Sequence, residues 1–503
     1  MNLKKMPVLL IYPTNYRVSG LPIGIASIAA VLKREEYDVK IFDTAFYPNQ
    51  NESNQNETRS KKGMSKKIVN EDVVYDNTGD MFEDLRRIIM LHDTKIVGIS
   101  LLQSTYEIGV SLTRFIKANF PYIIIVAGGV LPTLIPDMIF EEPSIDSICL
   151  GEGEMPFLKF CDRFSSGSED IVQTPGFWIK WHGTKYKNKP AKVCRLEELP
   201  YPDFSEFDSR LFFKPMQGRL YKMINIETTR GCPHMCTYCS APSLRAFFKQ
   251  NECGTYYRKM DIDYITGQID YQVNKYKPEF IYFSSEMFLA FSDEEFSKFE
   301  DSYSKHKIPF WFQTRFETVT KERLEALKKI GMLWITLGLE HGNEEFRKKM
   351  LKRNYSNEKA LECVKILKEV GVGASINNII GFPGETRELI FDTININKRL
   401  YEINNLIECN VFMFTPFLGS DLYDYCAENN LLISDEKLTH TSLYRDDDKI
   451  LNYNENWNKE LGGLSKTFNL YVKLDEKYYP QIKIAEKNDA EGIEMLDKLL
   501  KLI

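Results

Sequence analysis

Short apolar runs alternate with amphipathic stretches in two separate parts of this chain of 503 residues. Strand-length segments that alternate with helix-length segments are typical of a parallel β-sheet covered by helices. The first alternating part spans residues 1–166 and the second spans residues 220–428. Because a chain of this length exceeds one ordinary core, we expect two successive α/β domains.

Residues 1–166 predict a Rossmann-like or flavodoxin-like domain. Residues 48–80 interrupt its pattern, are rich in Asn, Ser, Lys and Glu, and show no hydrophobic periodicity. We therefore expect them to form a long surface loop or a partly disordered segment. The predicted strands are 8–12, 39–42, 96–99, 123–126 and 145–149, and the predicted helices are 21–33, 81–91, 106–119 and 154–164.

Residues 167–219 are rich in proline and aromatic residues, and they predict a linker with a small hairpin at 177–181 and 185–186. The next part, 220–428, predicts an open, six-stranded version of a (β/α) barrel, whose active site would lie at the carboxyl ends of the strands. Residues 429–503 predict a small C-terminal capping or substrate region that ends in an amphipathic helix, 490–500. The barrel strands are expected at 223–227, 280–283, 310–314, 334–337, 374–380 and 408–414, with helices such as 321–330, 357–370 and 388–401 between them.

The overall composition limits which binding partners and which cellular compartment we expect. A net charge of -6 provides no basic field, so we expect no nucleic-acid partner. The apolar run at residues 6–13 is too short for a signal or membrane-spanning segment, which makes the cytoplasm the expected location. Ten cysteines in a chain of this size fit a reducing compartment, where thiolates are available to bind metal.

Three of these cysteines, Cys232, Cys236 and Cys239, lie within eight residues. They have the character of an incomplete iron–sulfur ligand set, because a cubane cluster has four irons and three thiolates leave one iron open. The alternative is a zinc site. Zinc sites are usually closed by four Cys or His ligands in paired spacings, and the nearest candidates, His234 and Cys253, form no second pair.

The spacing Cys-x-x-x-Cys-x-x-Cys, with Tyr238 before the last cysteine, closely resembles that of the radical S-adenosylmethionine (SAM) enzymes. The resemblance implies a 4Fe-4S cluster whose open iron chelates the amino and carboxylate groups of SAM. Further segments match that family in register after the cysteines. The SAM-binding residues implied are Tyr238, Glu286 for the amino group, Arg315 for the carboxylate, Glu340 for the ribose, and Asn378 and Gly381 beside the adenine.

The first domain resembles the cobalamin-binding domain that precedes the radical module in a large subgroup of these enzymes. A flat corrin on the carboxyl edge of a sheet needs residues without bulk, and its nucleotide tail needs an apolar slot. The matching segments are 21–24, 97–100, 127–129 together with Thr133, and 151–154. The residues implied for cobalamin are Leu21, Gly24, Ser100, Gly128, Gly129, Thr133, Gly151 and Glu152.

One departure from other cobalamin proteins concerns the ligand below cobalt. The mutases and methionine synthase use an Asp-x-His-x-x-Gly segment, whereas residues 43–47 of this chain read Asp-Thr-Ala-Phe-Tyr. The only histidine before residue 182 is His92, which we expect on the surface at a helix end. We therefore expect cobalamin to bind without a protein histidine ligand.

The resemblance implies that a 5'-deoxyadenosyl radical activates an unreactive carbon and that methylcobalamin delivers a methyl group to it. It also implies a small-molecule or peptide substrate and an electron donor such as flavodoxin or ferredoxin. The main alternative is a cyclase or rearrangement enzyme that uses cobalamin without methyl transfer; a cobalamin or redox sensor would not need Glu286 and Glu340. A methylthiotransferase would need N-terminal cluster cysteines, but the first cysteine is Cys149.

Overall fold

The computed structural model describes residues 5–14, 20–47, 59–68, 79–433 and 451–503. The chain forms two compact units, one of residues 1–52, 72–213 and 240–260, the other of residues 53–71, 214–239 and 261–503. These boundaries differ from the expected ones. The expected linker 167–219 belongs mainly to the first unit, and the C-terminal region 429–503 is part of the second.

The first unit contains a seven-stranded sheet in the order β2-β1-β3-β4-β5-β6-β7. The five strands β1 to β5 pair in parallel, which confirms the Rossmann-like prediction. The strands are β1 (Lys5–Tyr12), β2 (Tyr37–Asp43), β3 (Ile96–Ser100), β4 (Ile124–Gly128), β5 (Ser147–Cys149), β6 (Phe177–Trp181) and β7 (Thr184–Lys187). The helices are α1 (Ile23–Arg34), α3 (Met81–His92), α4 (Tyr106–Asn119), α5 (Val130–Leu134), α6 (Pro136–Glu141), α7 (Glu154–Ser165) and α8 (Ala241–Gln250).

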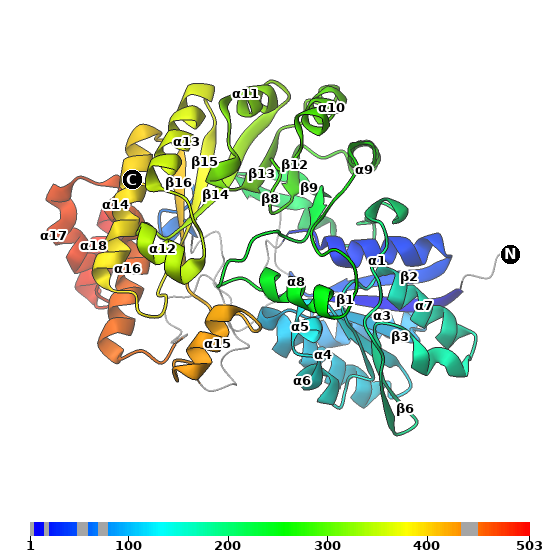
Figure 1. Ribbon diagram of the computed structural model, residues 1–503. Coiled ribbons are helices and arrows are strands. Elements are labelled where there is room, and N and C mark those ends of the chain that lie inside the picture. The colour runs from blue at the N-terminus through cyan, green and yellow to red at the C-terminus, as the bar shows by residue number, and fades with distance from the viewer. Residues whose placement is uncertain (1–4, 15–19, 48–58, 69–78, 434–450) are drawn as a thin grey trace. The chain divides into compact units, whose positions relative to one another are not determined.

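The strand order reverses beside β1, which lies between β2 and β3. Because crossover connections are right-handed, this reversal puts α1 on one face of the sheet and α3 and α4 on the other. Helix α1 packs against α7, and α3 packs against α4 (Figure 1). In such sheets ligands bind at the carboxyl ends of the strands near the reversal, which is where the predicted cobalamin residues lie.

We expected the hairpin β6–β7 to be part of a linker. It instead belongs to the sheet of the first unit. Strand β6 pairs antiparallel with β5, from Ser147 opposite Ile179 to Cys149 opposite Phe177. Phe177 and Ile179 are fully buried, and the Phe177 ring stacks on Phe160 of α7 with centroids 4.6 Å apart. Burial of these apolar side chains explains why the hairpin extends the sheet.

The second unit contains a second seven-stranded sheet, in the order β16-β15-β14-β13-β12-β9-β8. Six of these strands pair in parallel, which confirms the partial (β/α)6 barrel (Figure 1). The strands are β8 (Phe213–Met216), β9 (Arg219–Glu227), β12 (Phe280–Ser284), β13 (Phe310–Thr314), β14 (Met332–Glu340), β15 (Gly373–Ile380) and β16 (Ile407–Met413). The helices are α9 (Ile262–Tyr276), α10 (Asp293–Tyr303), α11 (Lys321–Lys329), α12 (Glu344–Leu351), α13 (Asn357–Val370), α14 (Arg387–Ile403), α15 (Asp421–Glu428), α16 (Glu455–Lys473), α17 (Tyr479–Ala485) and α18 (Ala490–Leu500).

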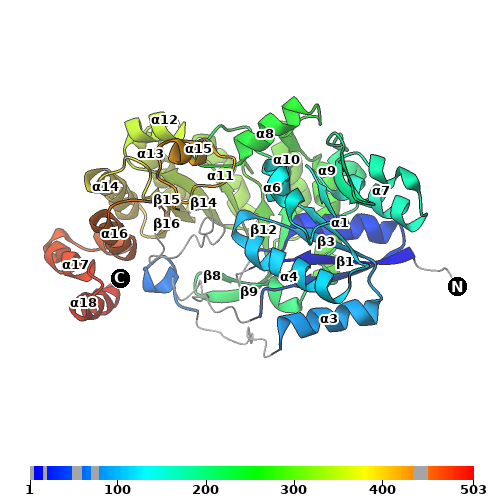
Figure 2. The same cartoon turned by 90° about the horizontal axis from the view of Figure 1, so that it is seen from below.

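Three C-terminal helices, α16 to α18, pack beside one another, and α16 also packs against α14 and β16 (Figure 2). The last of them, α18, has the bounds expected for the C-terminal amphipathic helix. Within the described part of the chain, no helix is both long and apolar enough to cross a membrane, including α16 with its 19 residues.

The burial of residues 59–68 differs from what we expected. We predicted 48–80 as a surface loop, but Lys62 and Met64 are only 4% and 0% exposed. The Lys62 ammonium donates to the Ser465 hydroxyl at 3.0 Å, and the Asn469 amide donates to the Lys62 carbonyl at 3.0 Å. The segment therefore packs against α16 through buried polar contacts, which hydrophobic periodicity does not reveal. The rest of the predicted loop, 48–58 and 69–78, lies outside the described residues.

We expect Asn469→Ala to lower the free energy of unfolding by about 2 kcal/mol, because it removes a buried amide that serves two carbonyls. That amide donates to the carbonyls of Lys62 and Cys409, both at 3.0 Å. Chemical denaturation of the purified protein would measure the loss. The matched control is Asn488→Ala, at an exposed asparagine beyond α17, and equal stability of the two variants would contradict the buried contact.

Candidate active site

The three cysteines of the predicted cluster motif lie in the loop after β9, at the carboxyl end of the strand. None of the three forms a disulfide; Cys236 is buried, and Cys232 and Cys239 are half-buried. Thr237 fixes the loop, since its hydroxyl donates to the Met350 carbonyl at 2.6 Å. The Cys239 amide donates to the Cys236 carbonyl at 3.2 Å, so the loop turns between these two cysteines.

Among the described residues, no group of three His, Cys, Asp or Glu side chains is arranged around a point where one metal ion would fit. A cubane cluster makes a different demand, because each thiolate binds a different iron and the sulfurs therefore lie further apart. Burial raises the pKa of the Cys232 thiol, and a hydrogen bond from the backbone at His234 acts against that rise. Arg315 donates to the Cys236 sulfur at 3.8 Å, which holds that side chain in place. This donor set fits an iron–sulfur cluster.

Glu286 follows β12 on a turn held by the residue before it. The Ser285 and Thr229 hydroxyls are 2.6 Å apart, and the Met287 amide donates to Ser285 at 3.1 Å. Glu286 is exposed, yet the surrounding protein excludes enough water to raise the pKa of its carboxyl, and Glu340 adds to the rise. A carboxylate that a neighbouring carboxylate makes costlier to ionise favours a cationic ligand beside it.

Glu340 ends β14 in an unusual backbone conformation. Its φ is +66°, in the left-handed region that costs a non-glycine residue about 1 kcal/mol or more. The β14–β15 register shifts between Gly338 and Glu340, which marks a bulge. Bulges re-aim side chains, and a Cβ at Gly338 would collide with the Glu340 carboxyl. Gly338 therefore lets the Glu340 carboxylate fold back over the strand end.

Arg353, which the sequence analysis missed, lies at the centre of this site. It is 5% exposed, and its guanidinium is 3.3 Å from the Glu340 carboxylate and 3.1 Å from the Tyr238 hydroxyl. It also donates to the Gly338 carbonyl at 2.6 Å. Arg353 thus joins the cysteine loop to the end of β14. The run Lys352-Arg353-Asn354 after a helix carries no signal that distinguishes this arginine from a surface one.

Arg315 follows β13 beside the cysteine loop, as its predicted role requires. Its guanidinium forms an ion pair with Glu317 at 2.8 Å, and the side chain is buried apart from 8% of its surface. Burial and bidentate pairing hold the fork in place next to Cys236. A contact between Arg315 and the SAM carboxylate stays a prediction.

Asn378 does not face the barrel interior. Its amide donates to the carbonyl of Asn410 at 3.0 Å, and its oxygen accepts from Asn397 of α14 at 2.7 Å. The side chain is fully buried between the sheet and that helix, so its role is structural. Three residues on, Gly381 has φ +86°, which favours glycine, and its carbonyl accepts from the Tyr453 hydroxyl at 3.2 Å.

In the first unit, the predicted cobalamin residues line the carboxyl ends of β3, β4 and β5. Gly129 has φ +105°, and a Cβ there would approach the Leu101 carbonyl at 3.0 Å and the Ser100 hydroxyl at 3.2 Å. Thr133 bridges two loops, because its hydroxyl donates to the Gly129 carbonyl at 2.8 Å and accepts from the Gly151 amide at 3.0 Å. This edge is closely packed and free of bulk, as a flat corrin requires.

The start of α1 and the end of β5 complete this edge. A Cβ at Gly24 would meet nothing within 4 Å, and one at Gly151 would lie 3.7 Å from the Phe247 ring. Leu21 is buried and gives the helix start an apolar contact. The Glu152 carboxylate forms an ion pair with Arg258, a partner that the sequence analysis did not foresee.

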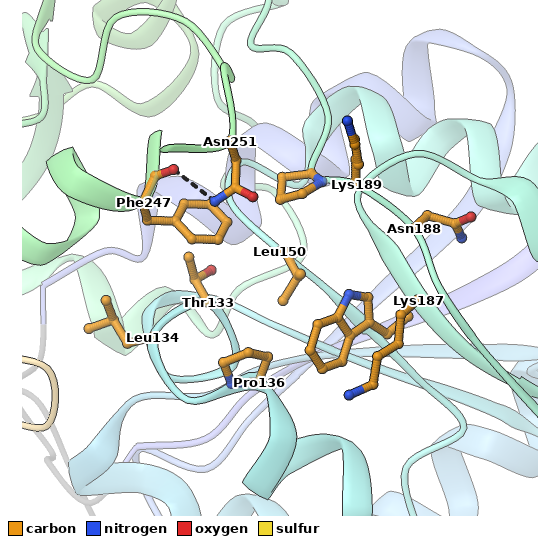
Figure 3. A pocket seen from close by; sticks show the side chains of 11 residues that line it. Thr133, Leu134, Pro136, Leu150, Lys187, Asn188, Lys189, Phe247 and Asn251 are labelled. Carbon is orange, nitrogen blue, oxygen red and sulfur yellow. Dashed lines mark hydrogen bonds between the residues drawn. The ribbon is translucent and has the colours of Figure 1, made fainter. Parts of the chain in front are cut away.

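A pocket of about 430 Å³ adjoins the same edge (Figure 3). Thr133 and Leu150 form one wall of it, and Phe247 and Asn251 of the α8 region close another. A whole cobalamin is larger than this space, so the pocket suits one part of a ligand that extends along the strand ends. Its lining also includes Leu134, Pro136, Trp178, Lys187, Asn188, Lys189 and Pro190.

Neither histidine of the first unit lies at the edge with the glycines. His92 ends α3, 3.8 Å from Asp38 at the start of β2, and His182 lies in the β6–β7 turn. Both positions belong to the amino-terminal edge of the parallel strands. The His92 side chain is only 6% exposed, so the expectation that it lies on the surface was wrong, because it packs against β2.

Asp43, at the carboxyl end of β2, offers a pH test of this unit. Burial raises the pKa of its carboxyl to about 6, and Asp208 adds to the rise. The folded state therefore binds this proton more tightly than the unfolded chain, and stability falls as pH rises from about 4 to about 6. We expect Asp43→Asn to stabilise the protein by about 2 kcal/mol at pH 7.5. Thermal unfolding should show the gain shrinking at pH 4; a gain independent of pH would contradict this assignment.

Two family models match the chain. Residues 11–160 match the B12 binding domain, and residues 226–396 match the Radical SAM superfamily. These ranges cover β2 to β5 of the first unit, the end of β1, and most of the barrel.

Several known proteins are similar over most of the chain. An uncharacterized methyltransferase of Pyrococcus horikoshii is 25% identical, with 88% of this chain and 87% of that protein covered. The cytidylyl-2-hydroxyethylphosphonate methyltransferase of Streptomyces wedmorensis is 22% identical, with 92% and 88% covered. An anaerobic magnesium-protoporphyrin IX monomethyl ester cyclase of Rubrivivax gelatinosus is 24% identical, with 72% and 63% covered.

Among solved structures, the cobalamin-dependent SAM radical enzyme OxsB, with aqua-cobalamin and SAM bound, has a TM-score of 0.66 and 14% identity. The match covers 99% of this chain and 71% of that one, and it supports the order of the two α/β folds. The cysteine loop and the two carboxylates lie within the range that matches the Radical SAM superfamily, and the glycine edge lies within the range that matches the B12 binding domain. The chain belongs to the cobalamin-binding radical SAM enzymes, whose cofactors are a 4Fe-4S cluster, SAM and cobalamin.

Proposed function

We propose that this enzyme transfers a methyl group to an unactivated carbon of a small-molecule or peptide substrate. The observation that supports the radical part is the cysteine loop itself, whose Tyr238 hydroxyl accepts from Arg353, the partner of Glu340. Support for methyl transfer comes from the two relatives named methyltransferases, which match nearly their whole length. When bound, the cluster and SAM supply a 5'-deoxyadenosyl radical, and cobalamin supplies the methyl group.

In this proposal, the predicted site residues of the second unit have the following roles. The three cysteines hold the cluster, Glu286 accepts from the SAM amino group, and Arg315 pairs with the SAM carboxylate. Glu340 accepts from the ribose hydroxyls, which two carboxylate oxygens are suited to do. Gly381 brings backbone close to the adenine, and Tyr238 acts through Arg353, which keeps the Glu340 carboxylate in place. Asn378 no longer has a place in this set.

The first unit would bind the corrin along the carboxyl ends of its strands. Gly128, Gly129 and Gly151 leave room for the ring, and Ser100 and Thr133 place hydroxyls at the same edge. Leu21 and Gly24 would border the nucleotide tail. Glu152 enters only through its ion pair with Arg258, which fixes the loop after β5. No histidine of this unit would reach the cobalt from below.

The second candidate is cyclisation or rearrangement without methyl transfer. The similarity to a magnesium-protoporphyrin ester cyclase favours it, because the match to that protein covers 72% of this chain. The two reactions differ in their products from SAM. Methyl transfer consumes a second SAM and forms S-adenosylhomocysteine, whereas rearrangement does not.

The test is anaerobic reconstitution with iron, sulfide and hydroxocobalamin, followed by SAM, a strong reductant and a panel of candidate substrates. We expect 5'-deoxyadenosine and S-adenosylhomocysteine in equal amounts with an accepted substrate, and transfer of label from methyl-labelled SAM to carbon. A substrate that is converted with 5'-deoxyadenosine but without S-adenosylhomocysteine would overturn methyl transfer and establish the second candidate.

In the cell, we expect flavodoxin or ferredoxin as the electron donor and the cytoplasm as the location, since the thiols must stay reduced.

A further inference from the structure

His341 directly follows Glu340, and its ring is completely buried between the ends of β14 and β15. Its Nδ1 accepts a hydrogen bond from the Asn343 amide at 3.1 Å. The ring proton therefore resides on Nε2, which donates to Oε1 of Glu385 at 3.0 Å. The tautomer of His341 is thus set by the backbone on one side and the carboxylate on the other.

The second oxygen of Glu385 holds the turn after β15. It accepts from the Gly381 amide at 2.5 Å and from the Phe382 amide at 3.0 Å. Hydrogen bonds from backbone amides to a buried carboxylate are stronger than bonds between neutral groups. One carboxylate therefore connects His341 of the β14 end with the glycine turn of the β15 end.

Neighbouring side chains fix the His341 ring in one position. The Phe346 ring stacks on it with centroids 4.3 Å apart and planes inclined by 26°. Arg347, which is fully buried, donates to the His341 carbonyl at 2.6 Å. Neighbouring residues thus fix both the ring and the backbone of His341. A displacement of Glu385 would therefore shift His341, the residue next to Glu340.

The backbone ladder cannot provide this connection. The pairing between β14 and β15 ends with Glu340 opposite Asn378, after the bulge. Gly381 and Phe382 lie beyond that last pair, at the carboxyl end where a ligand would bind. The hydrogen bond between His341 and Glu385 therefore joins the two strand ends where their ladder has stopped.

We propose that His341 and Glu385 are positioning residues that fix the nucleoside half of SAM. The inference rests on the proposed function, in which Glu340 accepts from the ribose and Gly381 lies beside the adenine. The pair sets the distance between these two contacts without touching the ligand. It acts on the nucleoside and leaves the cluster and the methionine half unchanged.

The experiment measures equilibrium binding of SAM and of 5'-methylthioadenosine, which lacks the amino-acid part, to the reconstituted holoenzyme. The variants are His341→Phe, which keeps the stack on Phe346 but not the hydrogen bond, His341→Gln, which keeps a donor, and Glu385→Gln. The matched control is His306→Phe, because His306, in the turn after α10, also pairs with a carboxylate, Asp270 of α9, at 2.8 Å. Iron content and the thermal midpoint are recorded for every variant.

We expect His341→Phe and Glu385→Gln to weaken both ligands about ten-fold or more and to the same degree. His341→Gln should recover part of the loss, and His306→Phe should bind as the wild type does. Variants with a lower thermal midpoint but unchanged affinities would overturn the inference, and so would a loss for SAM alone. If His341→Phe does not fold, the affinities of the Glu385→Gln and His341→Gln variants decide.

A wild-type protein that binds neither ligand would overturn the proposed function itself, whereas normal SAM binding without methyl transfer would leave this inference intact.

Discussion

We expect the Cys232→Ala/Cys236→Ala/Cys239→Ala protein to lose roughly four irons per chain, the content of one cubane cluster. Without the cluster no electron reaches SAM, so 5'-deoxyadenosine formation should fall to background. Iron analysis, absorption spectroscopy and product chromatography after anaerobic reconstitution would measure both losses. Cobalamin binding should persist, because its predicted residues belong to the other unit.

The control for this variant is Cys194→Ala, a half-buried cysteine outside the motif, which should retain iron and activity. Persistent 5'-deoxyadenosine from the triple variant would show that the cluster assignment is wrong. Retained iron without 5'-deoxyadenosine would instead mean that other ligands hold the metal and that the motif only orients it.

Replacing Arg353 with methionine should be the most damaging single substitution outside the cysteine loop. It removes the buried cation 3.3 Å from the Glu340 carboxylate and leaves that carboxylate without its cation. Breaking a buried ion pair from one side costs about 3–5 kcal/mol. We expect the free energy of unfolding to fall by about that amount at pH 7.5, and SAM affinity to fall at least about ten-fold.

Arg353→Lys separates charge from geometry. Lysine keeps the positive charge but lacks the planar fork that reaches Tyr238, Gly338 and Glu340 together, so it should restore stability more than SAM affinity. Arg399→Met, at an exposed arginine of α14, is the matched control and should change neither quantity. Wild-type SAM binding by Arg353→Met would contradict a role for this arginine in the site.

The sequence predicted the regular elements of both units closely. Helices α4, α13 and α18 have the expected bounds, because each is a long amphipathic segment with its own end signals. The Ser356 side chain, for example, caps α13 by accepting from Lys359, and Gly371 ends it with φ +71°. Such signals are local, and they act over three or four residues.

The cysteine motif could also be predicted from the sequence, since all three cysteines lie within eight residues of one loop. The orientation of the Asn378 side chain, in contrast, could not be predicted from the sequence. Residues of a strand alternate between its two faces, and the bulge at Glu340 changes which side chain of the neighbouring strand lies opposite. A shift of one residue exchanges interior for exterior, so motif register alone could not decide where Asn378 points.

By itself, then, the sequence determined the two α/β folds, the thiol loop, the acidic residues at the strand ends and the lack of a histidine at residues 43–47. Only the tertiary structure decided that residues 59–68 pack on α16, that Arg353 joins Tyr238 to Glu340, and that His341 meets Glu385. These contacts link positions 13 to 407 residues apart in the chain. Periodicity and end signals encode which face of an element is buried, but the partner of a buried polar group depends on how distant elements pack.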